Sequence, residues 1–80
     1  MDDSEVQDHI EALVAEEHRL FDSTHESGRT DAERLRLEEI RVQLDRYWDL
    51  LRQRRAREEF GADPESAQMR PGETVEKYWQ

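Results

Sequence analysis

Hydrophobic residues recur every three or four positions in two long stretches of the chain. The first stretch contains Val6, Ile10, Leu13, Val14, Leu20 and Phe21, and the second contains Leu37, Ile40, Leu44, Tyr47, Trp48 and Leu51. This spacing is typical of amphipathic helices that bury one side. It predicts helix 1 at about residues 5–25 and helix 2 at about residues 31–60.

Two pairs of polar residues fit the starts of these helices. Ser4 with Gln7, and Thr30 with Glu33, have the three-residue spacing of a capping box. A turn at residues 26–30 then joins the helices, and Gly61 ends the second one. Because a short connection makes long helices antiparallel neighbours, the fold class is all-α, an antiparallel two-helix hairpin over residues 1–60.

The remaining residues, 61–80, form a C-terminal tail that is expected to be partly helical. Asp63 followed by Pro64 is a favourable helix start. Val75, Tyr78 and Trp79 have the i, i+3, i+4 spacing of a final helical turn. Tyr78 and Trp79 are therefore expected either to dock on the hairpin or on a partner subunit, or to be captured by another protein, and these alternatives stay open.

Helix 2 carries a second apolar side, formed by Leu35, Val42 and Phe60 with Leu50 nearby. Two apolar sides indicate two packing partners, namely helix 1 and either a second copy of the chain or the tail. Since one hairpin buries only a thin core, we favour a homodimer whose centre is a four-helix bundle. The residues expected at packing interfaces are Leu35, Val42, Trp48, Leu51 and Phe60.

Glu17 falls within the apolar side of helix 1. An unpaired carboxylate in a core is costly, so Glu17 needs a partner or a route to water. Arg41, about one turn from its level on the facing helix, is the first candidate. The sequence therefore predicts a buried polar pair of Glu17 and Arg41.

The charge is unevenly distributed over a chain with a net charge of −9. The basic residues concentrate in a cluster at the end of helix 2, formed by Arg52, Arg54, Arg55 and Arg57. This cluster is expected to lie at an interface or on a solvated face, or else to bind an anionic partner. A nucleic-acid-binding module is an alternative, which the net negative charge disfavours because phosphate neutralisation supplies much of the affinity.

Few side chains are arranged for chemistry. His18, Asp22 and His25 share one helix face and are weak candidates for a metal site. The chain has no cysteine, and it shows neither a phosphate-binding loop nor a nucleophile elbow. We therefore expect no enzymatic activity, no cofactor and no small-molecule substrate.

The sequence also bears on location. No apolar run approaches the ~18–20 residues that span a bilayer, so we expect no membrane segment. The chain begins Met-Asp-Asp-Ser-Glu, which is the opposite in charge of a secretory signal. These features predict a cytoplasmic protein.

Three groups of residues resemble a family of short actinobacterial proteins known as domain of unknown function 2630. The most specific is Trp-Asp-Leu-Leu-Arg-Gln-Arg-Arg at 48–55; the others are Ile-Glu-Ala-Leu-Val-Ala-Glu-Glu-His at 10–18, and Val-Glu-Lys-Tyr at 75–78 with Asp63-Pro64 and Arg70-Pro71. The resemblance implies a small cytoplasmic helical protein and assigns no activity. Together these features predict a non-enzymatic interaction or adaptor protein. It would act through homo-oligomerisation, the arginine cluster and the aromatic tail.

Overall fold

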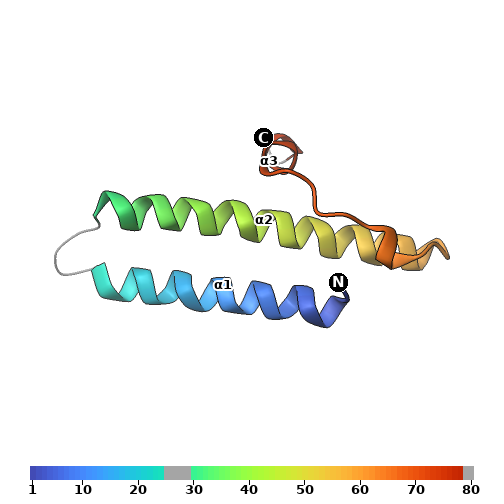
Figure 1. Ribbon diagram of the computed structural model, residues 1–80, viewed down its shortest axis with the longest axis horizontal. Helices are drawn as coiled ribbons and strands as arrows, with labels where there is room; N and C mark the ends of the chain where they lie inside the picture. Colours follow the sequence, from blue (N-terminus) through green and yellow to red (C-terminus); the bar gives the residue numbers. More distant parts are fainter. Residues whose placement is uncertain (25–29, 79–80) are drawn as a thin grey trace.

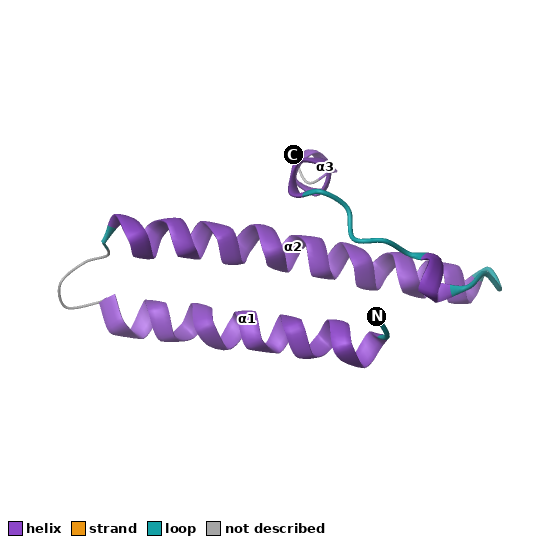
Figure 2. Cartoon of the chain, in the orientation of Figure 1, coloured by secondary structure: helices purple, strands orange, loops and turns teal. Residues whose placement is uncertain are grey.

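The computed structural model describes residues 1–24 and 30–78. Two long helices run side by side, and a tail returns along the second of them (Figure 1). The regular structure of the described residues is helical throughout, which confirms the predicted all-α class and the two long helices with a short tail (Figure 2). The elements are α1 (Asp3–Thr24), α2 (Asp31–Glu59), the 3₁₀ helix η1 (Pro64–Ser66) and α3 (Gly72–Tyr78).

The predicted capping box is found at the start of α2 but not at the start of α1. Thr30 and Glu33 form the predicted capping box, in which each side chain accepts the other residue's backbone N–H at 3.1 Å. The box predicted at the start of α1 is wrong, because the carboxylate of Asp2 accepts the backbone N–H of Glu5 at 2.8 Å. Helix α1 therefore begins two residues early. The expected turn at Gly28 lies outside the described residues.

Gly61 reverses the chain after α2. Its φ of +73° is a left-handed conformation that an L side chain would strain, so glycine suits this position. The tail then begins as expected: the side chain of Asp63 accepts the backbone N–H of Glu65 at 3.0 Å, and Pro64 opens η1.

The core lies between the first half of α1 and the second half of α2. Leu50 belongs to it, although the pattern placed that residue near the second apolar side. Two tail side chains, Ala67 and Met69, pack against this core and extend it around α2. Its buried members are Val6, Ile10, Leu50 and Leu51.

The tail also lies close against α2 at Gly72. A Cβ atom placed on Gly72 would lie 2.7 Å from Cγ1 of Val42, which is shorter than van der Waals contact. Val75 follows in α3 and is buried. The tail therefore occupies part of the second apolar side of α2, one of the two partners foreseen for it. Tyr78 ends α3, and Trp79 lies outside the described residues.

Candidate functional site

Arg54 is the most buried member of the arginine cluster, with 5% of its surface exposed. Its Nε donates to Oδ1 of Asp3 at 2.6 Å, and its Nη2 donates to Oε1 of Glu65 at 3.1 Å. The bond to Asp3 is the largest cause of the raised pKa of Arg54. The expectation that Arg54 meets an outside partner is thus corrected, because its guanidinium joins α1, α2 and η1 within the chain.

The other three arginines divide between the tail and solvent. Arg57 is half-buried, and its Nη1 donates to Oγ of Ser66 at 2.9 Å. The side chains of Arg52 and Arg55 are exposed. The predicted four-arginine patch is therefore split, and two of its members hold the tail.

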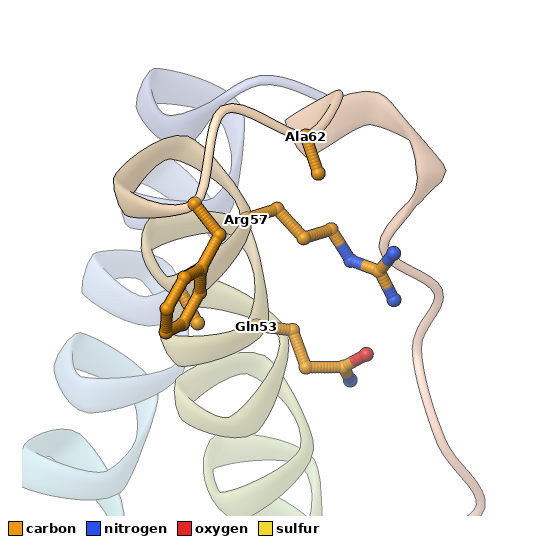
Figure 3. Close-up of a pocket in the computed structure, with 5 residues that line it drawn as sticks. Gln53, Arg57 and Ala62 are labelled. Atoms are coloured by element: carbon orange, nitrogen blue, oxygen red, sulfur yellow. The ribbon is translucent and has the colours of Figure 1, made fainter.

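An open hollow of about 310 Å³ lies beside this end of α2. Gln53 and Arg57 extend from the helix toward the side on which Ala62 lies (Figure 3). Phe60, which also lines the hollow, is 86% exposed. The end of α2 is thus a shallow, partly apolar surface beside the start of the tail.

A buried carboxylate anchors the middle of the tail. Asp49 accepts a bidentate pair of hydrogen bonds from Nε and Nη2 of Arg70, the first of them at 2.8 Å. Gln53 donates to the same carboxylate at 3.0 Å. The Arg70 guanidinium holds the pKa of Asp49 below its usual value, although burial alone would raise it.

Two bonds to tail carbonyls complete this anchor. Arg46 Nε donates to the carbonyl oxygen of Arg70 at 2.9 Å, and Gln53 Nε2 donates to that of Gln68 at 3.0 Å. The pattern analysis missed Asp49 and its partners. One signal was present: Asp49 lies seven residues after Val42, so it falls on the second apolar side, where a carboxylate needs a cationic partner.

The residues expected at packing interfaces have three different environments. Leu51 is buried in the hairpin core, so its place in a packing interface is within the chain. Val42 lies against Gly72 of the tail. The remaining three, Leu35, Trp48 and Phe60, are exposed large apolar side chains.

The sequence predicts a buried pair of Glu17 and Arg41, but neither side chain is buried. Arg41 is not buried, and its guanidinium bonds along its own helix, to Glu38 at 2.7 Å and to Asp45 at 3.4 Å. Glu17 is half-buried and lines the same open groove as Arg41. The predicted buried pair is therefore corrected: water reaches this groove, and carboxylates one turn away on α2 are close enough to bind Arg41.

That groove has a volume of about 310 Å³ and runs along one broad side of the hairpin. Phe21 and Leu37 supply its apolar lining, with Phe21 46% exposed. Trp48 follows Leu37 by eleven residues, about three helical turns, so it lies on the same side of α2 and is 44% exposed. We call this side, with Phe21, Leu37, Arg41 and Trp48, the open face.

The opposite broad side is more polar. The rings of His9 and Tyr47 stack with centroids 5.0 Å apart. Glu16 accepts two bonds from Arg36, both at 2.6 Å, and these bonds lower the pKa of Glu16. Glu16 and Arg36 therefore already form a pair across the hairpin.

The weak metal candidates are not gathered into a described site. His18 and Asp22 lie exposed on α1, and His25 lies outside the described residues. Within residues 1–24 and 30–78, no three side chains of the metal-binding types come together.

None of the described helices combines the length and the apolar character needed to cross a bilayer.

The sequence is similar to those of known proteins. An uncharacterised protein of Mycobacterium bovis and one of Mycobacterium tuberculosis H37Rv are each 46% identical to the chain over 77 residues, covering 95% of the chain and 88% of each relative. No solved structure gives a significant match. The profile of a family described as protein of unknown function (DUF2630) matches residues 2–80. The chain therefore belongs to the DUF2630 family.

Proposed function

We propose that the protein is a non-enzymatic helical interaction protein whose working surface is the open face of the hairpin. The observation that carries this proposal is the exposure of Phe21 and Trp48 beside Arg41. Aromatic side chains and arginine are enriched in protein–protein interfaces. They also account for many of the residues whose removal weakens binding most.

The pairing of the charged side chains supports a non-enzymatic role. Arg54 with Asp3, Arg70 with Asp49 and Arg36 with Glu16 are each joined by short hydrogen bonds. Such pairs fix the positions of helices and tail, whereas a catalytic group has to face a substrate. The protein works in the cytoplasm in this proposal.

The arginine cluster has a smaller part in the proposal than the sequence suggested. Arg52 and Arg55 extend the basic edge of α2 and are exposed. Arg54 holds two carboxylates, so it brings no excess positive charge to a nucleic acid. With a net charge of −9, the nucleic-acid alternative has less support than protein binding.

Site-specific photo-crosslinking in living cells tests the proposal. A photoreactive phenylalanine analogue replaces Trp48 on the open face, and the matched control carries it at Phe60, which is more exposed but lies on another side of α2. We expect an adduct with a protein chain from position 48 and none from position 60. A helical, stable protein that gives no adduct from position 48 would overturn the proposal.

A further inference from the structure

The described elements form a single row. Helix α2 contacts α1 on one side and both η1 and α3 on the other, so it lies in the middle (Figure 1). The principal extents of 51, 26 and 15 Å describe a flat, elongated body. Domains are ordinarily built from at least two packed layers, and this chain supplies one.

The position of Trp48 on α2 shows which side of the helix has no other described element packed on it. The side chains that hold the tail lie on one side of α2, and the residues facing α1 lie on the other. Arg41 and Trp48 fall between these sides, at 100° of rotation per residue. The described elements therefore leave the open face without a helix packed against it.

The chain exposes more surface than a compact protein of its mass. The chain exposes 5775 Å², whereas a compact monomer of 9.6 kDa exposes about 5,100 Å². The excess of about 700 Å² is close to the roughly 800 Å² that each partner contributes to a standard interface. An interface of standard size would therefore reduce the exposed area of each chain to about that of a compact monomer.

The charges of the two helices favour a second copy as the partner at this interface: α1 has a net charge of −6 and α2 a net charge of zero, so a pairing of α1 with α2 avoids placing one acidic helix on another. Helix α1 carries seven acidic residues and one arginine, whereas α2 carries eight acidic residues and eight arginines. Two copies related by a twofold axis parallel to the helices place each acidic α1 over the arginine-bearing α2 of the other copy. Such an interface is self-complementary, as closed dimers require.

We infer that the open face packs against the open face of a second copy, so that Phe21, Leu37 and Trp48 become the core of a four-helix bundle. This inference rests on the proposed function and names its partner. It differs from the interface expected from the sequence, because the tail lies against Val42 on the second apolar side. The polar side is a weaker choice, since its large apolar side chains, Leu13 and Tyr47, are more buried than Phe21 and Trp48.

Light scattering on the full chain, from low to high micromolar concentration, tests this inference. We expect twice the chain mass of 9.6 kDa. Trp48→Glu and Phe21→Glu should each raise the dimer Kd at least about a hundredfold, because a symmetric interface receives every added charge twice. Phe60→Glu, an added charge at a more exposed apolar site, should leave the Kd unchanged.

Circular dichroism of each variant shows whether it stays folded, and Phe21→Glu decides the matter if Trp48→Glu unfolds. A wild-type monomer at the highest concentration would overturn the inference. So would loss of the dimer in Phe60→Glu with a persistent dimer in Trp48→Glu. A monomer that still crosslinks to a different protein from position 48 would overturn the second copy as partner and leave the proposed function standing.

Discussion

Arg54 and Asp3 are 51 residues apart in the sequence, yet the guanidinium Nε donates to the carboxylate at 2.6 Å. Asp3 stands in the first turn of α1, where the helix dipole favours negative charge. Since Arg54 also holds Glu65, one buried side chain fixes the open end of the hairpin and the start of the tail. One member of the arginine cluster, Arg54, is therefore a structural residue that joins α1, α2 and η1.

Replacing Arg54 should therefore lower the stability of the fold. Arg54→Leu leaves Asp3 and Glu65 without their shared donor, so we expect a loss of about 1–3 kcal/mol in the free energy of unfolding. Urea denaturation at one fixed protein concentration measures it. The control Arg55→Leu changes an exposed neighbour and should alter stability by about 0.5 kcal/mol or less. Equal losses in the two variants would contradict the structural role of Arg54.

Gly72 should be required for the tail to dock. Gly72→Ala places a methyl group against Val42, and overpacking of this kind costs about 1–3 kcal/mol, although alanine favours helix. Hydrogen exchange at the α3 amides should accelerate while exchange in α1 stays unchanged.

A second substitution makes the test specific to that contact. In Gly72→Ala/Val42→Ala, removal of Cγ1 makes room for the new methyl group, so exchange in α3 should slow again and the two effects should be non-additive. Additive losses would show that Gly72 acts through the flexibility of the chain instead of the contact.

The parts of the fold that the sequence predicts are those set by local rules. The helical periodicity, the Thr30–Glu33 capping box and the left-handed Gly61 depend on residues close in sequence, and all three are found. The anchor between Asp49 and Arg70 depends on where the tail returns, which no local pattern specifies. For that reason the sequence leaves two partners open for the second apolar side of α2, the tail and a second copy of the chain.

The candidate site was less predictable, because hydrophobic periodicity identifies the apolar side of a helix but does not identify which element packs against it. Leu51 and Phe60 were both assigned to packing interfaces. The structure buries Leu51 against α1, whereas Phe60 lies beyond the start of α1 and meets solvent. The sequence likewise does not distinguish Arg54 from the other arginines of the cluster, because its partners Asp3 and Glu65 come close to it only in the folded chain.

Alanine substitutions at Leu51 and Phe60 should therefore differ sharply. Leu51→Ala removes a buried side chain and opens a cavity, for which we expect a loss of about 2–5 kcal/mol. Phe60→Ala should change stability by about 0.5 kcal/mol or less, since its side chain is exposed. Thermal and urea unfolding followed by circular dichroism measure both. A comparable loss from Phe60→Ala would mean that Phe60 is buried in solution.

The bond between Asp49 and Arg70 should make the tail sensitive to acid. The pKa of Asp49 is lowered in the folded protein, so its stabilising contribution is complete above the unfolded value of about 3.9 and is lost as the pH falls through the folded value. Asp49→Asn keeps the shape and removes the charge. We expect it to cost about 1–3 kcal/mol at neutral pH.

The pH profile distinguishes this charge effect from a packing effect. The difference in unfolding free energy between wild type and Asp49→Asn should shrink as the pH is lowered below the unfolded value of about 3.9, because the unfolded carboxylate then binds a proton that the folded carboxylate, held by Arg70, resists. Glu59→Gln, at an exposed position on the same helix, should show a much smaller difference at every pH. A wild-type advantage over Asp49→Asn that stays constant down to about pH 2 would mean that Arg70 does not stabilise an ionised Asp49, and the tail would then be retained by its other contacts with α2.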